Sequence, residues 1–290
     1  MKTRPECLPC YLKQVLSMAR AVQASEKQQL AALTAACQVI PTLNYEVSPA
    51  ENSTLVLWAA QRILGESDPF KAKKQEINAA LLKVLPDYRR QVSAAFDPLY
   101  SALLFSVAGN IIDLGILPEY DLERAIAEVQ AVEFAINDYA ELREQLCKAR
   151  KIVVLGDNAG EIVFDRLLVQ ELAKFAPVTY VVKGAPILND ATLDDAGQVG
   201  MAEDATVISN GSGYLGTVLA DVSAELKGEL RAADLIVSKG QANFETLADV
   251  PAPLYFVLRA KCACVADELG VQEGAMVLKQ SDNFAPSARV

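Results

Sequence analysis

The chain contains no histidine among its 290 residues. Without an imidazole it cannot assemble a Ser-His-Asp or Cys-His triad, a His-ligated zinc hydrolase centre or a phosphohistidine intermediate. Any acid–base or metal chemistry must therefore use carboxylates, amides, amines, hydroxyls or thiols.

Basic residues are also few, since 27 Lys and Arg face 37 Asp and Glu and leave a formal net charge of −10. Nucleic acids and anionic membranes bind basic surfaces, so we expect neither as a partner. No apolar run approaches the roughly 20 residues that span a bilayer, and no signal peptide is predicted. Six cysteines are too few for a disulfide scaffold in a chain of this length. These absences predict a globular cytoplasmic protein with reduced thiols.

The first half of the chain has helical periodicity. Three of the 15 glycines fall in residues 1–150, and the stripe of Tyr11, Val15, Met18 and Val22 has the spacing of a buried helix face. Prolines are expected at helix boundaries, and Asn52-Ser53-Thr54 is expected to cap one helix. We therefore predict a helical domain over residues 1–146.

From residue 147 onward, short apolar runs alternate with helical segments, for example 162–175 and 214–226. This alternation predicts an open, doubly wound, mostly parallel α/β sheet over residues 147–290. Each run ends in a polar cluster, and such sheets bind ligands outside the carboxyl ends of their strands. The five predicted strands are Ile152–Leu155, Val178–Val182, Ala205–Ile208, Leu235–Val237 and Leu254–Leu258.

Oxygen ligands follow the first two predicted strands. Asp157 and Asn158 follow the first, and Asp190 follows the second. Carboxylate and amide oxygens suit a hard ion such as Mg²⁺ or Mn²⁺. The alternative is that these residues only form a turn and cap a helix. Glu161 opens the next predicted helix, where the helix dipole favours a carboxylate even without a functional role.

Two later clusters are typical of anion-binding loops, namely Asn210-Gly211-Ser212-Gly213 and Ser238-Lys239-Gly240-Gln241. Lys239, Arg259 and Lys261 place cations at strand ends of an acidic protein. Any one of them alone is explained as a solvated side chain, whereas together they favour an anionic small molecule. Neither a Walker A motif nor Gly-x-Gly-x-x-Gly is present.

The cysteines allow two interpretations. Cys7, Cys10, Cys262 and Cys264 would form a structural zinc site or a redox group if they met, or else they are inert buried residues. Cys37 and Cys147 are expected in the core. Asn110 and Asp113, in an apolar helical stretch, are expected either to tie the two domains together or to reach the site.

Taken in order, these motifs resemble the damage-control phosphatase family, which is also called ARMT-like and was formerly a domain of unknown function. The resemblance rests on Gly156-Asp157-Asn158-Ala159-Gly160-Glu161, Asn189-Asp190-Ala191-Thr192, Ser209-Asn210-Gly211-Ser212, Lys239-Gly240-Gln241-Ala242-Asn243-Phe244 and Arg259-Ala260-Lys261-Cys262. Cys7-Leu8-Pro9-Cys10 and Gly109-Asn110-Ile111-Ile112-Asp113 extend it over almost the whole chain. The length and the cysteine pair are similar to the smaller, prokaryotic-type branch.

The resemblance implies a helical domain on a Rossmann-like core that hydrolyses phosphate monoesters with Mn²⁺, Co²⁺, Ni²⁺ or Mg²⁺. Its metal ligands match Asp157, Asn158 and Asp190, and its substrate-binding stretch matches Lys239 to Asn243. The family's Arg-Thr-x-Lys signature appears as Leu258-Arg259-Ala260-Lys261, where only the lysine keeps its place.

The resulting hypothesis is a phosphatase of small, phosphorylated or damaged metabolites such as sugar phosphates. Lys239 and Lys261 would neutralise the phosphoryl group, and Asn210, Asn243 and nearby backbone N–H groups would orient it. Either a water molecule or Asp157 would be the nucleophile. One alternative is a non-catalytic module that binds a metal or phosphorylated metabolite. The other is a carboxyl methyltransferase using S-adenosylmethionine, which lacks support because an Asp-Asn pair replaces the usual glycine-rich loop. The oligomeric state stays open.

Overall fold

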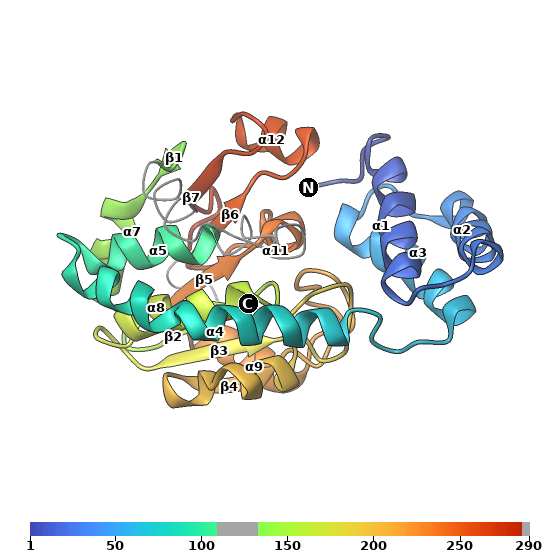
Figure 1. Cartoon of the computed structure of the whole chain (residues 1–290). Coiled ribbons are helices and arrows are strands. Elements are labelled where there is room, and N and C mark those ends of the chain that lie inside the picture. Colours follow the sequence, from blue (N-terminus) through green and yellow to red (C-terminus); the bar gives the residue numbers. More distant parts are fainter. Residues whose placement is uncertain (109–132, 286–290) are drawn as a thin grey trace.

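The computed structural model describes residues 1–108 and 133–285; Asn110 and Asp113 lie outside them. Figure 1 shows α1–α3 beside an α/β body whose sheet is flanked by helices. The helices are α1 (Cys7–Ala21), α2 (Glu26–Val39), α3 (Pro49–Leu64), α4 (Lys71–Ala94), α5 (Pro98–Ala108), α7 (Tyr139–Leu146), α8 (Glu161–Leu172), α9 (Leu193–Val199), α10 (Ala224–Ala232), α11 (Gln241–Leu247) and α12 (Ala263–Leu269), with short 3-10 helices η1 (Ile40–Thr42) and η2 (Met201–Glu203). The strands are β1 (Ile136–Asn137), β2 (Ile152–Leu155), β3 (Val178–Val182), β4 (Thr206–Ser209), β5 (Leu235–Lys239), β6 (Leu254–Arg259) and β7 (Met276–Gln280).

The sheet has seven strands in the order β1-β7-β6-β5-β2-β3-β4. All neighbours are parallel except β6 and β7. The order reverses at β2, which pairs with β3 on one side and β5 on the other. The prediction of a doubly wound, mostly parallel sheet after a helical region is confirmed, and the topological switch point lies between β2 and β5.

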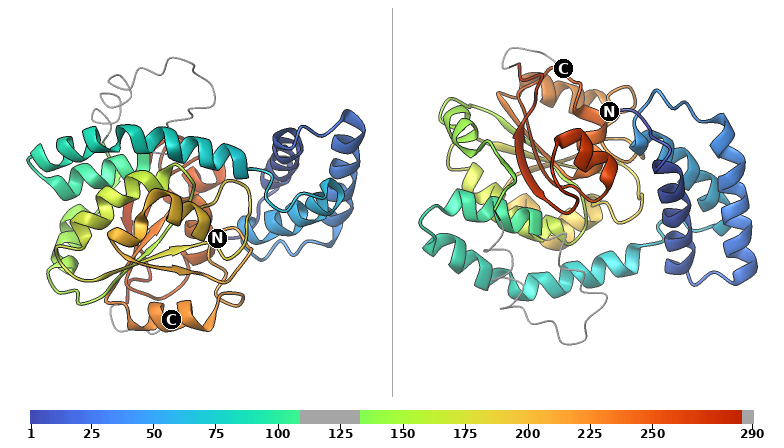
Figure 2. Two further views of the ribbon diagram at one scale, coloured as in Figure 1. Left: turned by 60° about the horizontal axis from the view of Figure 1, so that its bottom comes forward. Right: turned by 90° about the horizontal axis from the view of Figure 1, so that it is seen from above.

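Side chains of the central strands alternate between two apolar layers, as the pleat requires. Ile152 and Val154 pack with residues of α4, α5, α8 and α9. Val153 and Leu155 point to the other face, where α10–α12 and the first helices pack. The two views in Figure 2 show α1–α3 on the flank of the body and α4 along its face. In the described ranges, no helix is long and apolar enough to cross a membrane.

The helical half departs from prediction at α3. This helix begins at Pro49, because Ser48 and Glu51 form a reciprocal capping box and proline suits the first helical position. Asn52-Ser53-Thr54 is therefore not the cap but a buried segment inside the helix.

Several other expectations are wrong. Pro86 lies inside α4 rather than at a boundary. The predicted helix over 214–226 forms only from Ala224, where Ser223 accepts the capping hydrogen bond from Leu226 N–H. Cys37 and Cys147 are exposed rather than in the core.

The boundary at residue 146 stays a prediction. Before it, β1 already pairs with β7, so part of the predicted helical domain contributes to the sheet.

Candidate active site

The loops that follow β2 and β3 lie against each other at the carboxyl edge of the sheet. Asn158 and Asp190 form an isolated antiparallel bridge. Beside it, Ala191 N–H donates to the carbonyl of Asp157 over 2.8 Å. Backbone hydrogen bonds thus bring the three predicted metal ligands together.

The carboxylates of Asp157 and Asp190 are buried, and nearby cations offset only part of the cost of burying their charge. Burial raises the pKa of Asp190 to about 7, with Lys183 lowering it and Asp157 raising it further. Burial also raises the pKa of Asp157, although Lys261, Lys183 and Lys239 oppose the shift. Two carboxylates that repel each other in a buried site are stabilised by an added cation.

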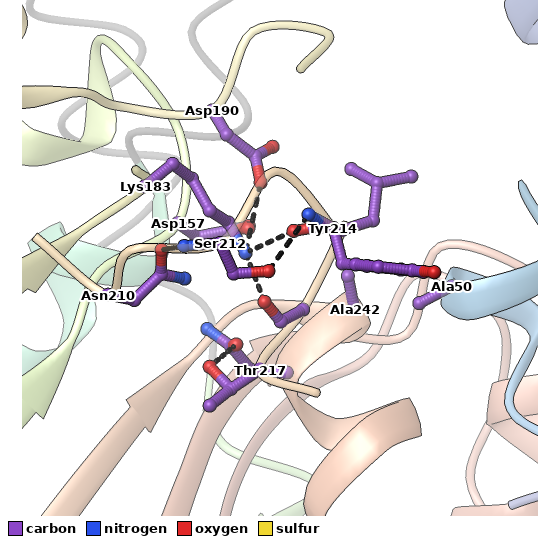
Figure 3. A network of polar contacts seen from close by, with 12 residues as sticks. Ala50, Asp157, Lys183, Asp190, Asn210, Ser212, Tyr214, Thr217 and Ala242 are labelled. Carbon is purple, nitrogen blue, oxygen red and sulfur yellow. Dashed lines mark hydrogen bonds and ion pairs between the residues drawn. The ribbon is translucent and has the colours of Figure 1, made fainter. Parts of the chain in front are cut away.

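Lys183, which sequence reasoning did not single out, faces this pair from the end of β3. Its Nζ lies 3.5 Å from Asp190 Oδ2. It also donates to the carbonyl of Tyr214 over 3.1 Å and to that of Gly216. Figure 3 shows the Lys183 ammonium between Asp190 and the loop that holds Tyr214. Its position directly after a predicted strand was the available signal.

The donor set fits a hard divalent cation. Asp190 Oδ2 is buried, and the Lys183 ammonium approaches it only to 3.5 Å. The neighbouring donors are a second carboxylate and an amide, which suit Mg²⁺ or Mn²⁺. In the part of the chain that is described, no three thiol or carboxylate side chains form a group that would hold a metal. The predicted ligand set is of another kind, with two carboxylates and one amide.

A second charge cluster lies beneath this pair, and its members are all paired. Lys239 is fully buried and donates to Asp165 Oδ1 over 2.6 Å and to the Ser106 carbonyl over 2.8 Å. Glu161 lies 3.4 Å from the same ammonium, and Tyr180 donates to Asp165 over 2.6 Å. Burial lowers the pKa of Lys239, but Asp165 and Glu161 outweigh it and the pKa is raised. Lys239 therefore stays charged while enclosed by protein.

Asn158 connects the two clusters. Its Nδ2 lies 2.7 Å from both Asp157 Oδ2 and Glu161 Oε1 and donates to each. Burial raises the pKa of Glu161 to about 7 against the lowering effect of Lys239. The amide is thus oriented by two carboxylates, one in each cluster.

The turn after β5 approaches the site closely. Gly240 has φ +82°, and a Cβ there would overlap the Asp157 carboxylate. Asn243 Nδ2 donates to the carbonyls of Lys239 over 2.7 Å and Gly156 over 3.2 Å. Glycine is required here both by the backbone conformation and by the space that Asp157 occupies.

The remaining predicted binding residues lie in the loop after β4 and within strands β5 and β6. Asn210 Oδ1 accepts from Gly184 N–H and Ser212 N–H, over 2.8 Å and 2.9 Å. Ser238 is fully buried, and Arg259 Nε donates to the Gly274 carbonyl over 3.1 Å.

A cavity of about 350 Å³ opens above the paired loops, between the first helices and the α/β body. Asp157, Asn158, Asp190 and Lys261 line it, whereas Glu161, Asn210, Ser212, Ser238, Lys239, Gly240, Asn243 and Arg259 do not. The other lining residues are Glu6, Cys7, Cys10, Tyr11, Gln14, Pro49, Ala50, Ser53, Leu188, Asn189, Leu215, Gln241, Ala242, Glu245, Cys262, Ala263 and Cys264.

All four paired-motif cysteines therefore share one cavity with the predicted catalytic residues. Burial raises the pKa of Cys7 and raises that of Cys264 to about 12, and each thiol also affects the pKa of the other. Thiols with raised pKa stay protonated near neutral pH and are poor nucleophiles.

Helix α4 also reaches the site, which sequence reasoning missed. Asn78 Oδ1 accepts from Gly160 N–H over 2.7 Å, and its Nδ2 donates to Asp195 over 3.1 Å. Lys74 pairs with Asp195 at 3.2 Å. These polar residues in a helical stretch carry no local signal of their buried partners.

Comparison with known proteins identifies relatives of this chain. A family model described as "Damage-control phosphatase ARMT1-like domain" matches residues 3–277. An uncharacterized protein of Methanocaldococcus jannaschii is 36% identical over 96% of this chain and 95% of its own length. A damage-control phosphatase of Pyrococcus horikoshii is 33% identical over 96% of this chain and 97% of its own length.

A solved structure has a similar fold. The crystal structure of a DUF89 family protein from Pyrococcus horikoshii has a TM-score of 0.91 and 31% sequence identity, covering 97% of this chain and all of that chain. The chain belongs to the damage-control phosphatase ARMT1-like family. The resemblance predicted from the motifs is confirmed.

Proposed function

We propose that this protein is a metal-dependent phosphatase that hydrolyses phosphate monoesters of small metabolites. The observation that supports this most directly is that the buried carboxylates of Asp157 and Asp190 both line one cavity, where Asp190 Oδ2 meets its cation, Lys183, only at 3.5 Å. Family membership supports the same activity.

In this proposal Asp157, Asn158 and Asp190 hold Mn²⁺, Co²⁺, Ni²⁺ or Mg²⁺. A bound divalent ion supplies Lewis acidity toward a phosphoryl oxygen. Lys183 keeps Asp190 in place through its ion pair, and Asn158 is held by Glu161.

Lys261 is the cation that meets the phosphoryl group. It lines the cavity, and its charge acts on Asp157 and on Asp190. An ammonium at that position neutralises charge that spreads over the phosphoryl oxygens during transfer. Lys239 acts indirectly, by fixing Glu161 from below.

Hydrolysis of p-nitrophenyl phosphate tests the proposal. Metal-stripped protein receives Mn²⁺, Co²⁺, Ni²⁺, Mg²⁺ or Zn²⁺ singly, and turnover is expected only with a metal. Asp157→Ala and Asp190→Ala should each abolish it while circular dichroism stays unchanged. Glu225→Gln, on the exposed side of α10, serves as the control and should keep full turnover. Bound metal without turnover would contradict the proposal and favour a metabolite-binding module.

A further inference from the structure

The Thr54 hydroxyl connects helix α3 to the α/β body. This threonine lies inside the helix and is fully buried. Its Oγ1 donates to the Ala50 carbonyl within α3 over 2.8 Å and accepts from Leu215 N–H over 3.0 Å. Leu215 lies 161 positions further along the chain, in the loop of residues 210–223 between β4 and α10. The segment that the sequence predicted as a helix cap therefore makes a long-range contact instead.

A second contact holds the same loop against α3. Trp58, one turn after Thr54, packs edge-on against Tyr214, and their ring centroids are 4.8 Å apart. Further along the loop, Thr217 Oγ1 donates to Asn243 Oδ1 of α11 over 2.7 Å. The α/β body thus fixes one side of the loop, whereas α3 fixes its middle.

The peptide group that α3 holds also binds Lys183. Lys183 Nζ donates to the Tyr214 carbonyl over 3.1 Å and to the Gly216 carbonyl. The Tyr214 carbonyl and the Leu215 N–H belong to one trans peptide group, in which they point in opposite directions. Thr54 on one side of this rigid plane therefore sets where the carbonyl on the other side meets the Lys183 ammonium.

The same ammonium lies at a distance from the Asp190 carboxylate. Lys183 is buried, and its Nζ is 3.5 Å from Asp190 Oδ2. Figure 3 shows it between that carboxylate and the loop of Tyr214. An unrestrained ammonium would approach a carboxylate oxygen to about 2.8 Å, because a charge-assisted hydrogen bond is stronger than one to a neutral carbonyl. The loop carbonyls thus keep the ammonium from direct contact with Asp190.

We infer that Thr54 is a positioning residue for the metal site: by fixing the Tyr214–Leu215 peptide group it keeps the Lys183 ammonium away from Asp190 and leaves that carboxylate open to a divalent cation. The inference rests on the proposed function, in which Asp190 is a metal ligand. An ammonium in direct contact with Asp190 would occupy an oxygen that the cation needs and would also repel the cation. Helix α3 therefore acts on metal affinity through a chain of hydrogen bonds.

Binding of Mn²⁺ to metal-stripped protein, measured by isothermal titration calorimetry, tests this without a substrate. Thr54→Val keeps a similar shape but cannot accept from Leu215 N–H, and should raise the Kd for Mn²⁺ about five- to tenfold, the effect of one buried hydrogen bond. Thr54→Ser keeps the acceptor and should stay within about twofold of the wild-type protein. Thr34→Val is the matched control, because Thr34 Oγ1 donates to the Leu30 carbonyl of α2 over 2.8 Å and its side chain is exposed.

Removing the ammonium distinguishes positioning from a general defect in α3. In Lys183→Met nothing closes on Asp190, so Mn²⁺ should bind at least as tightly as in the wild-type protein. Adding Thr54→Val to Lys183→Met should then change the Kd less than about twofold, whereas a structural defect would weaken binding equally in both backgrounds.

Trp58→Leu provides an independent variant at a half-buried position. It loosens the same loop by removing the ring contact with Tyr214, and should raise the Kd for Mn²⁺ about two- to fivefold. This increase should also disappear in the Lys183→Met background. If Thr54→Val does not fold, as judged by circular dichroism, Trp58→Leu carries the test.

The outcomes separate the inference from the function on which it rests. An unchanged Kd in the folded variants, equal weakening with and without Lys183, or loss of Mn²⁺ binding in Lys183→Met would each overturn the inference and leave the proposed function standing. A wild-type protein that binds none of the divalent ions and hydrolyses no p-nitrophenyl phosphate would overturn the proposed function, and the inference with it.

Discussion

The site contains two buried charge clusters that are built in opposite ways. In the lower cluster, Lys239, Asp165 and Glu161, one ammonium pairs with both carboxylates and a backbone carbonyl. In the upper cluster, Asp157 and Asp190, the carboxylates meet their cations at a distance, and the Lys183 ammonium approaches Asp190 Oδ2 only to 3.5 Å. Paired charges preserve a shape, whereas carboxylates short of partners are suited to bind a ligand.

The largest expected effect comes from breaking the lower cluster. Lys239→Met leaves Asp165 and Glu161 buried without their cation, and should lower the free energy of unfolding by about 3–5 kcal/mol. Urea unfolding of the metal-free protein measures it. Adding Asp165→Asn to Lys239→Met should recover part of the loss. A loss below about 1 kcal/mol would show that the cluster is not the rigid support described.

Removing a charge from the upper cluster should raise the free energy of unfolding rather than lower it. Burial raises the pKa of Asp190 to about 7, so the folded protein keeps a proton that the unfolded chain loses from about pH 4 upward. Stability is therefore lost as pH rises from about 4 to 7 and stays low above it. Asp190→Asn removes this loss and should stabilise the metal-free protein on the order of 2–4 kcal/mol at pH 8, with little change at pH 4.

Without metal at pH 8, Asp190→Asn should be more stable than the wild-type protein. Mn²⁺ should reverse this order, because it stabilises the wild-type protein and not the variant. Unfolding at pH 4 and pH 8, with and without Mn²⁺, gives all four comparisons. Equal stability of the two proteins at pH 8 without metal would show that the upper carboxylates are already compensated.

The smallest of these effects concerns the close approach of Gly240 to the Asp157 carboxylate. In Gly240→Ala the new methyl group meets the Asp157 carboxylate, and a displacement of that side chain should cost turnover roughly 100-fold. Gly65→Ala is the matched control, because Gly65 also has a positive φ, +72°, and a Cβ there meets nothing within 4 Å. Similar turnover in both variants would argue against a fixed position for Asp157.

Much of the α/β half was predictable, because β2–β6 are short β-branched runs that end in polar clusters. Site residues whose positions depend on the order of the strands were predictable as well. Asp157 and Asp190 meet because the strands that precede them are neighbours. Strand β7 was missed, because an antiparallel edge strand that ends in Lys279-Gln280 lacks the continuous apolar run of a buried parallel strand.

Contacts between the halves were not predictable. Asn78 binds Gly160 across 82 positions of sequence, and neither residue differs locally from an ordinary helix residue or turn glycine. Lys239 was expected at the substrate, yet its ammonium turns inward because Asp165 and Glu161, one turn apart on α8, lie beneath it. Sequence spacing places a residue at a strand end, but packing decides which way its side chain points.

The cavity wall joins distant parts of the chain, since Cys7 contacts Cys264 and the Met1 ammonium donates to the Glu245 carbonyl over 3.2 Å. Domains generally form as units during synthesis, so α1–α3 leave the ribosome long before their counterpart in α11 and α12 exists. A nascent chain therefore lacks this pocket until residue 264 has emerged. Under the proposed function, a metabolite would bind in this cavity only after α11 and α12 have been made.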